Sequence, residues 1–303
     1  MSNLSATFTN ETKARAFLEA SRWPDGPVCP HCGKTETVSA LPPKGSMGEG
    51  WYHCRECREK FTVRVGTLYE RSHVPLHKWL YATHLLCSSK KGISSHQLHR
   101  MLGVTYKTAW FMAHRIREGM KPDEVSGGAL GGEGKTVEAD ETFIGRRAGK
   151  KVGPGPGHKI AVVALVERGG KVRSFKVPAP TKKVAQRILH LNVDRKSILM
   201  TDDSTLYSHD TGMTHHAVNH SAGEYVRGDV HTNTIEGVFS VFKRGMIGTY
   251  QHCGEQHLQR YLNEFDFRYS NRAKLGVNDE MRAGIALKGI EGKRLTYRRT
   301  VRA

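Results

Sequence analysis

The chain has 303 residues, 38% of them hydrophobic, and its 47 Lys and Arg outnumber its 29 Asp and Glu to give a formal net charge of +18. This length suits about two domains of ordinary size, and the hydrophobic content permits a buried core. So large a positive excess indicates a polyanionic partner, most simply nucleic acid, with a ribosomal or membrane-surface protein as the alternative.

No stretch of the sequence is typical of a membrane or secreted protein. The first 17 residues are polar and lack the apolar core of a signal peptide. No apolar run approaches the ~20 residues needed to cross a bilayer. We therefore expect a cytoplasmic protein without membrane association. Four of the six cysteines form two CxxC pairs, which in a reducing compartment indicates metal binding rather than disulfides.

Residues 1–70 are predicted to hold a short amphipathic segment followed by a zinc ribbon. Two CxxC pairs separated by 21 residues suit a closed, tetrahedral structural Zn²⁺ site, because thiolates are soft ligands and each pair can turn back onto one ion. The predicted ligands are Cys29, Cys32, Cys54 and Cys57. His31 and His53 stand beside these cysteines, and we expect them not to bind the metal. The alternative is four reduced structural cysteines without metal.

Residues 71–122 are predicted to form a helical region. After a first helix over 75–86, the segment 93–118 reads as two helices joined by a turn at Gly103, with Thr105 as a cap for the second. This pattern is typical of a helix-turn-helix, although a plain three-helix bundle would give a similar one. The predicted DNA contacts on the second helix are Lys107, Arg115 and Arg117.

A glycine-rich linker at 121–135 precedes a second domain, predicted over 136–275. The expected strands are 137–144, 160–167, 171–177 and 197–201, and the expected helices are 181–191, 234–244 and 257–269. Three strands, a helix, a strand and further helices follow the order of an α/β ribonuclease H-like fold, by analogy. The basic loop 145–158 is either a DNA contact or a solvated insertion, and residues 276–303 are expected to be a basic tail.

The stretch 136–145, TVEADETFIG, concentrates three acids in a strand-like run. Glu138 and Asp140 fall on one face of such a strand and Glu141 falls on the other. We expect at least one of the three to be solvated or salt-bridged, and Glu138 competes with Asp140 as a metal ligand.

Two further acidic points follow downstream. Asp202 and Asp203 end a predicted strand, and Glu236 begins an amphipathic helix, where it would be a capping-box glutamate if Asn233 were the N-cap. Cleavage of a phosphodiester needs charge neutralisation and an activated hydroxyl, which two Mg²⁺ or Mn²⁺ ions about 3.5–4 Å apart supply. These ions prefer oxygen ligands. Acids from three elements beside a DNA-binding region therefore favour a metal site.

Taken together, these blocks resemble the zinc-ribbon group of DDE transposases from bacterial insertion sequences. The resemblance covers about residues 29–272. It is carried by the four cysteines, VEADETFIG at 137–145, TDDSTLY at 201–207, HTNTIEGVFSVFKRGMIGTY at 231–250 and YLNEFDFRYSNR at 261–272. It implies a ribonuclease H-like catalytic domain with a DDE triad. Any one block alone would be weak, but their number and order are specific.

Carried over by position, the resemblance implies that the catalytic and metal-binding acids are Asp140, Asp202 and Glu236. It also implies DNA contacts from Lys243, seven residues after Glu236, and from the adjacent Arg244. Two departures stand out. Similar transposases have Gly where this chain has Asp203, which leaves Asp203 as an alternative second ligand, and Phe239 replaces a common Trp.

The implied activity is metal-dependent strand cleavage at the ends of an insertion sequence, followed by attack of the freed 3′-hydroxyl on target DNA. The zinc ribbon and the helix-turn-helix would recognise the terminal inverted repeats. Proteins of this kind act as homo-oligomers on paired ends, in the cytoplasm at the bacterial nucleoid. The alternatives are a catalytically inactive DNA-binding regulator derived from a transposase, and a structure-selective nuclease of the same fold.

Overall fold

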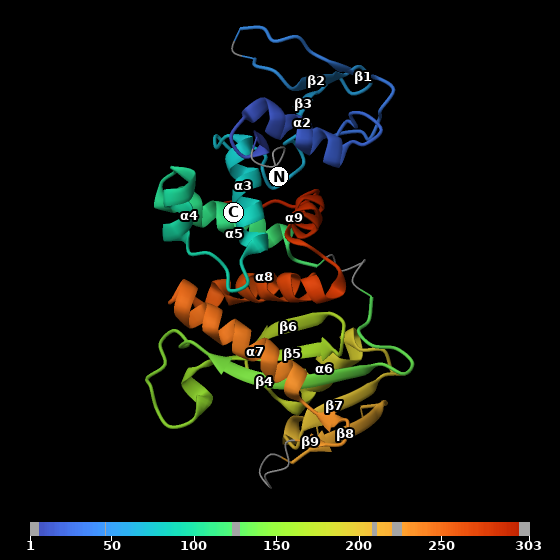
Figure 1. Cartoon of the computed structure of the whole chain (residues 1–303), viewed down its shortest axis with the longest axis vertical. Coiled ribbons are helices and arrows are strands. Elements are labelled where there is room, and N and C mark those ends of the chain that lie inside the picture. Colours follow the sequence, from blue (N-terminus) through green and yellow to red (C-terminus); the bar gives the residue numbers. More distant parts are fainter. Residues whose placement is uncertain (1–5, 46, 123–127, 208–210, 220–225, 297–303) are drawn as a thin grey trace, which may run out of the picture. The chain divides into compact units, whose positions relative to one another are not determined.

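The computed structural model describes residues 6–45, 47–122, 128–207, 211–219 and 226–296 (Figure 1). These residues gather into two units. The first comprises the described parts of 1–89, 93–120 and 279–303, and the second those of 90–92 and 121–278. No helix among the described residues is both long enough and apolar enough to cross a bilayer.

The first unit begins with a helix packed on a small sheet. Helix α2 (Glu11–Arg22) starts at Asn10, whose side chain accepts a hydrogen bond from the amide of Lys13. Strands β1 (Val38–Ala40), β2 (Trp51–Cys54) and β3 (Lys60–Thr62) form an antiparallel sheet in that order. The rings of Trp23, Tyr52 and Phe61 pack together between α2 and this sheet, which ties the helix to the ribbon.

Among the described residues, four further helices belong to the first unit: α3 (Leu76–Ser88), α4 (Ser95–Leu102), α5 (Tyr106–Gly119) and α9 (Asp279–Lys288). The side chains of Ser94 and Thr105 cap α4 and α5, and Gly103 takes the left-handed conformation (φ 58°) that ends α4. The predicted pair of helices around a glycine turn is therefore present. Helix α9 falls in the segment expected to be a basic tail, and it packs on α3 and α5.

The expectation that α5 exposes Arg115 and Arg117 is wrong. Arg117 is 0% exposed, and Arg115 is partly buried, donating to the backbone carbonyls of Glu70 and Leu295. Helix α5 packs against three helices, α3, α4 and α9, and its end at Gly119 lies against Ile290 and the α9 backbone. A helix covered on an additional side buries residues that its own periodicity places outside. Lys107, near the start of α5, is exposed as predicted.

The second unit is built on a five-stranded sheet in the order β6-β5-β4-β7-β8. Its strands are β4 (Thr136–Ile144), β5 (Ile160–Glu167), β6 (Val172–Val177), β7 (Ile198–Asp202) and β8 (Thr214–Val218). Strands β4, β5 and β6 form an antiparallel meander, and β7 and β8 run parallel to β4. This mixed sheet with flanking helices confirms the predicted ribonuclease H-like α/β fold. Strand β8 was not predicted.

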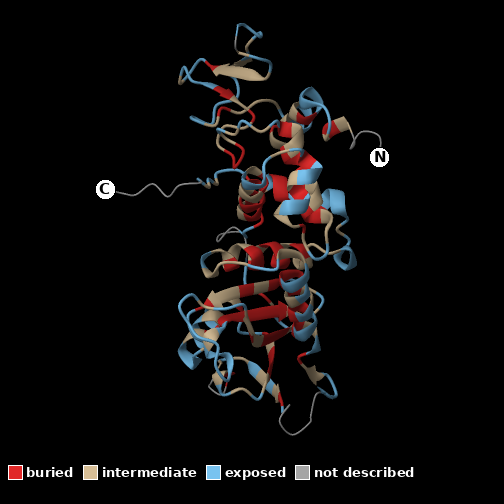
Figure 2. Cartoon of the chain, turned by 90° about the vertical axis from the view of Figure 1, so that its left-hand side faces the viewer, coloured by how far each residue is buried: buried red, intermediate tan, exposed pale blue. Residues whose placement is uncertain are grey.

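Helices cover both faces of this sheet. Helix α6 (Lys182–Asn192) packs Ala185 and Leu189 against Val137, Ala139 and Leu199. Helices α7 (Asn233–Gly245) and α8 (Leu258–Ser270) pack on the other face, where α7 crosses the sheet in Figure 1. Because both faces are covered, β5 is buried over nearly its whole length, as the red strands of Figure 2 show. Even-numbered residues of β4 therefore point toward α7 and odd-numbered ones toward α6.

Shorter elements connect these parts. A two-stranded hairpin, β9 (Val226–Arg227) and β10 (Val230–His231), leads into α7. Single helical turns are η1 (Pro156–His158), η2 (Thr205–Tyr207), η5 (Glu255–His257) and η6 (Ala273–Leu275), and a π-helical turn η4 (Met246–Tyr250) follows α7. Residues 297–303 of the predicted basic tail lie outside the described residues.

Candidate active site and metal centres

The register of β4 and β7 brings two predicted acids together. The strands pair in parallel, with Val137 opposite Leu199 and Glu138 opposite Met200. Two residues further on, Asp140 therefore comes alongside Asp202, the last residue of β7. Carboxylate oxygens of Asp140, Glu141 and Asp202 lie within 4.8 Å of one another. The middle of β4 and the end of β7 thus form a cluster of three acids.

Burial and mutual repulsion act together on this cluster. Burial, followed by the charges of Asp202 and Glu141, raises the pKa of Asp140 to about 8, and Glu236 adds a smaller contribution. Burial and the charge of Asp202 also raise the pKa of Glu141. A divalent cation would relieve this repulsion, and carboxylate oxygens are the donors that Mg²⁺ and Mn²⁺ prefer. The donor set therefore fits such an ion.

The structure distinguishes the two neighbouring aspartates at the end of β7. Asp202 belongs to the cluster, and its Oδ1 accepts a hydrogen bond from the amide of Ser204 at 3.2 Å. Asp203 is exposed and lies outside the group of clustered acids found among the described residues. The geometry favours Asp202 as the second acid.

Glu141 is closer to the cluster than its position on the strand suggested. It lies on the α6 face of β4, yet its carboxylate reaches Asp140 and Asp202, and its Oε1 accepts from the hydroxyl of Ser204 at 3.4 Å. Strand alternation placed Glu141 on the opposite face from Asp140, but it gave no sign that the two carboxylates lie close together. The neighbouring strand β7 ends at Asp202, and the turn after it brings Ser204 to the Glu141 carboxylate. Two adjacent acids in one strand were the available signal in the sequence.

Glu138 has a different environment from Asp140, although both point toward α7. Its side chain is 0% exposed and forms an ion pair with Arg168, whose Nε lies 2.6 Å from Oε1. Its Oε2 accepts from the amide of Ile235 in α7 at 2.9 Å. Glu138 is therefore the salt-bridged acid that the sequence led us to expect, and it does not compete with Asp140.

The third predicted acid, Glu236, stands in the first turn of α7. The N-cap is Thr232 rather than Asn233, so Glu236 is the fourth helical residue and not the capping-box glutamate. Its side chain is exposed, and its Oε1 accepts from the hydroxyl of Thr232 at 3.2 Å. It lies near enough to raise the pKa of Asp140, but outside the 4.8 Å group found among the described residues.

The two predicted basic residues of α7 lie near the far end of the helix from Glu236. Lys243 is partly buried, and Arg244 is exposed, with its Nε donating to the carbonyl of Ser240 at 3.2 Å. Lys243 follows Glu236 by about two helical turns, so the two side chains share a side of α7.

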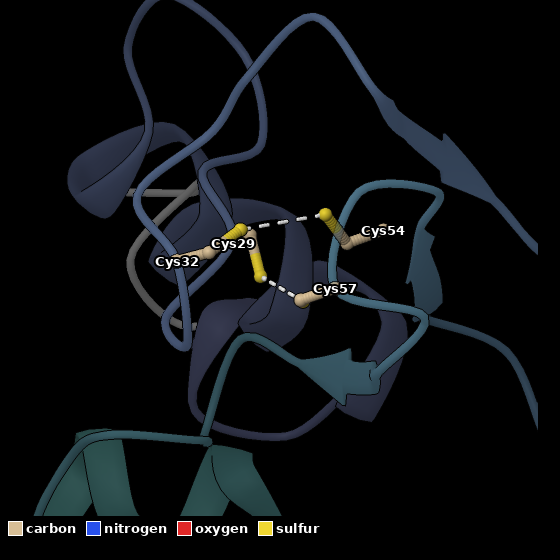
Figure 3. A group of neighbouring side chains, drawn as sticks. All are labelled: Cys29, Cys32, Cys54 and Cys57. Carbon is tan, nitrogen blue, oxygen red and sulfur yellow. Dashed lines mark hydrogen bonds between the residues drawn. The ribbon is translucent and has the colours of Figure 1, made fainter.

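The four predicted zinc ligands converge on one point, as Figure 3 shows. The Sγ atoms of Cys29 and Cys57 lie 3.6 Å apart, as do those of Cys32 and Cys54, and all four lie within 4.8 Å. A tetrahedron of sulfurs about 2.3 Å from Zn²⁺ has edges of about 3.8 Å. All four thiols are free. The set therefore fits a tetrahedral Zn²⁺.

Backbone turns of the same kind shape both halves of this centre. The residue after each CxxC pair is left-handed, Gly33 with φ 75° and Arg58 with φ 60°. The amide of Gly33 donates to the carbonyl of Cys29 at 2.9 Å. Such turns fold each pair of thiols toward the same point.

Known families match both parts of the chain. The family model of the ISXO2-like transposase domain matches residues 129–270, and that of the transposase zinc-ribbon domain matches residues 9–60. The chain belongs to the IS1595 group of zinc-ribbon DDE transposases. Both units of this transposase therefore agree with the resemblance seen in the sequence.

Individual relatives are more distant. An uncharacterized protein in transposable element ISH50 of Halobacterium salinarum is 28% identical over 283 residues, which cover 86% of this chain and 92% of the relative. A Mos1 transposase paired-end complex is 12% identical over 65% of this chain and 77% of its own, with a TM-score of 0.21. A pre-cleavage Mos1 transpososome is 11% identical over 65% of this chain and 74% of its own, with a TM-score of 0.19.

We expect the purified protein to carry about one Zn²⁺ per chain, and Cys57→Ser to lose it, because three thiolates hold the ion less tightly than four. Metal analysis by mass spectrometry measures both. Cys253→Ser is the matched control, since Cys253 lies outside the four-cysteine cluster. Zinc near zero in the wild type, or unchanged in Cys57→Ser, would contradict the centre.

The raised pKa of Asp140 predicts that stability of the metal-free protein falls with pH. The folded state holds the Asp140 proton up to about pH 8, whereas an unfolded Asp releases it near pH 4, so stability is lost as pH rises between these values. In chelator at pH 8, we expect Asp140→Asn to raise the free energy of unfolding by roughly 1–3 kcal/mol, and to change it little at pH 4.5.

Denaturant titrations at the two pH values measure this difference. Asp203→Asn, a neighbouring exposed acid, should leave stability unchanged at both. If Asp140→Asn changed the free energy of unfolding equally at both pH values, the pKa of Asp140 would not be raised.

Proposed function

We propose that this protein is an active DNA transposase that cleaves and joins the ends of an insertion sequence at the Asp140 site. The observation that carries this proposal is the closeness of the Asp140 and Asp202 carboxylates on adjacent parallel strands, in a domain of a transposase family. Two carboxylates held together against their repulsion are suited to a divalent ion and ill suited to a purely structural role.

The residues that would hold Mg²⁺ or Mn²⁺ are Asp140, Asp202 and Glu236, with Glu141 adjacent. When bound, such ions neutralise charge on a phosphate and lower the pKa of a bound water. The chain itself supplies the positions. Asp140 and Asp202 are fixed by strand pairing, while Glu236 is carried by the first turn of α7.

DNA binding is assigned to basic side chains that remain accessible. Lys107 is exposed at the start of α5, the second helix of the helix-turn-helix, where such motifs contact base edges and phosphates. Lys243 and Arg244 on α7 would contact the terminal phosphates. The burial of Arg117 and the backbone bonds of Arg115 remove both from this set.

The partners follow from this activity. We propose that the zinc ribbon and α4–α5 bind the terminal inverted repeats, and that the catalytic domain receives the cleavage site and later the target DNA. A homo-oligomer on paired ends would allow both ends to be processed together. Because the substrate is chromosomal DNA, we infer that the protein acts in the cytoplasm at the nucleoid.

Cleavage of the inverted repeats that flank the gene tests the proposal. With Mg²⁺, we expect the wild type to nick these ends and transfer them, and Asp140→Asn and Glu236→Gln to slow nicking by roughly 100-fold or more, because each loses a metal ligand. Binding to the ends, measured by gel shift, should change by less than about twofold, since these acids do not contact the recognition sequence.

Adjacent residues provide the matched control. Asp202→Asn should behave as Asp140→Asn, and Asp203→Asn should retain near wild-type nicking. Full nicking by Asp140→Asn would refute the site. Binding to the ends without any nicking by the wild type would instead support a catalytically inactive, transposase-derived regulator.

A further inference from the structure

Arg168 connects three parts of the catalytic domain through one guanidinium group. It lies in the turn between β5 and β6, and its Nε donates to Glu138 Oε1 at 2.6 Å. Its Nη1 donates to the carbonyl of Asp229, and its Nη2 to the carbonyl of His231, both at 2.8 Å. Asp229 and His231 belong to the hairpin that leads directly into α7. Arg168 thus joins β4 to the start of that helix.

Glu138 makes the second connection to α7. Its side chain is 0% exposed, and its Oε2 accepts from the amide of Ile235 at 2.9 Å. The N-cap residue of α7, Thr232, makes no side-chain capping bond. A carboxylate from a distant strand therefore satisfies an amide of the first turn, where negative charge is also favoured by the helix dipole. Ile235 immediately precedes Glu236 in the chain.

These contacts link the first and third acids of the site. Glu138 and Asp140 are two residues apart on the same face of β4, and Glu138 holds the residue before Glu236. Strand β4 therefore positions Asp140 directly, and it positions Glu236 through the hydrogen bond between Glu138 and the amide of Ile235 in α7.

We propose that Glu138 and Arg168 form a charged clamp that sets the position of Glu236 relative to Asp140, and so act as positioning residues for the metal site. This inference rests on the proposed function. The two residues would then do more than stabilise the fold. Glu138 lies outside the group of clustered acids found among the described residues, and together with Arg168 it holds the start of the helix that carries Glu236.

The chemistry of the two side chains suits this role. A buried carboxylate needs a compensating charge, which Arg168 provides. The planar guanidinium directs its donors along fixed directions and here reaches acceptors on β4 and on the hairpin at once. A lysine keeps the charge but cannot span the same acceptors. Arg168→Lys therefore separates geometry from charge, and Glu138→Gln removes charge while preserving shape and an acceptor for Ile235.

A double-mutant cycle tests the clamp. Glu138→Gln and Arg168→Lys are made singly and in a Glu236→Gln background, and the Mn²⁺ concentration that gives half-maximal thermal stabilisation is measured without DNA. We expect each single variant to raise this midpoint by about tenfold, as for other residues that orient metal ligands. In the Glu236→Gln background the same changes should raise it by less than about twofold, because they act through Glu236.

The matched control is Glu167→Gln, which breaks a neighbouring ion pair with Lys135 (2.9 Å) that does not involve α7. It should leave the Mn²⁺ midpoint within about twofold of wild type. If Glu138→Gln fails to fold, Arg168→Lys still decides the question, since the Arg168 side chain is 23% exposed and keeps its charge.

The outcomes separate the clamp from the proposed function. Equal shifts in both backgrounds, or unchanged midpoints in both folded single variants, would overturn the clamp while leaving the metal site intact. If the wild type shows no stabilisation by Mn²⁺, the proposed function fails, and the clamp fails with it.

Discussion

The parallel pairing of β4 with β7 is the constraint on which the candidate site depends. It brings Asp140 alongside Asp202 in a partly buried place, where like charges repel and the pKa of Asp140 rises to about 8. A parallel neighbour requires a crossover, and α6 provides it on one face of the sheet. The sheet topology thus imposes electrostatic repulsion between these carboxylates, and a divalent cation bound between them would relieve it.

The side chains of strand β4 point alternately to the two faces of the sheet. Val137 and Ala139 enter the core under α6, while Glu138 and Asp140 point toward α7. The two acids then divide the work. Glu138 is neutralised by Arg168 and holds the start of α7, whereas Asp140 has no cation partner among the described residues and remains available for a metal ion. Two acidic residues, two positions apart on one strand, acquire different roles from their surroundings.

Local sequence patterns were sufficient for features that local physics determines. The cysteine spacing predicted the four-thiol centre, the apolar run of β5 predicted a buried strand, and Gly103 with Thr105 predicted the turn between α4 and α5. Strand β8 (THHAV) was missed because only one of its residues is buried, so it carries little apolar signal.

What the sequence left open or misplaced depends on contacts between distant segments. Glu138 meets Arg168 30 residues away and Ile235 97 residues away, which no local pattern reveals. Arg117 is buried in a helix that packs against α3, α4 and α9, the last of which lies more than 150 residues later. The Glu141 carboxylate lies close to Asp140 and Asp202 because the last residue of β7 is beside it. Such pairings arise only when the sheet and its helices assemble.

Anomalous diffraction from crystals grown with Mn²⁺ tests the central claim most directly, because it locates the ion without reference to activity. The account predicts Mn²⁺ between Asp140 and Asp202, with carboxylate oxygens of both at about 2.1–2.2 Å and Glu236 turned toward the same site. Mn²⁺ bound elsewhere in the catalytic domain, or no Mn²⁺ beside Asp140 at saturating concentration, would contradict it.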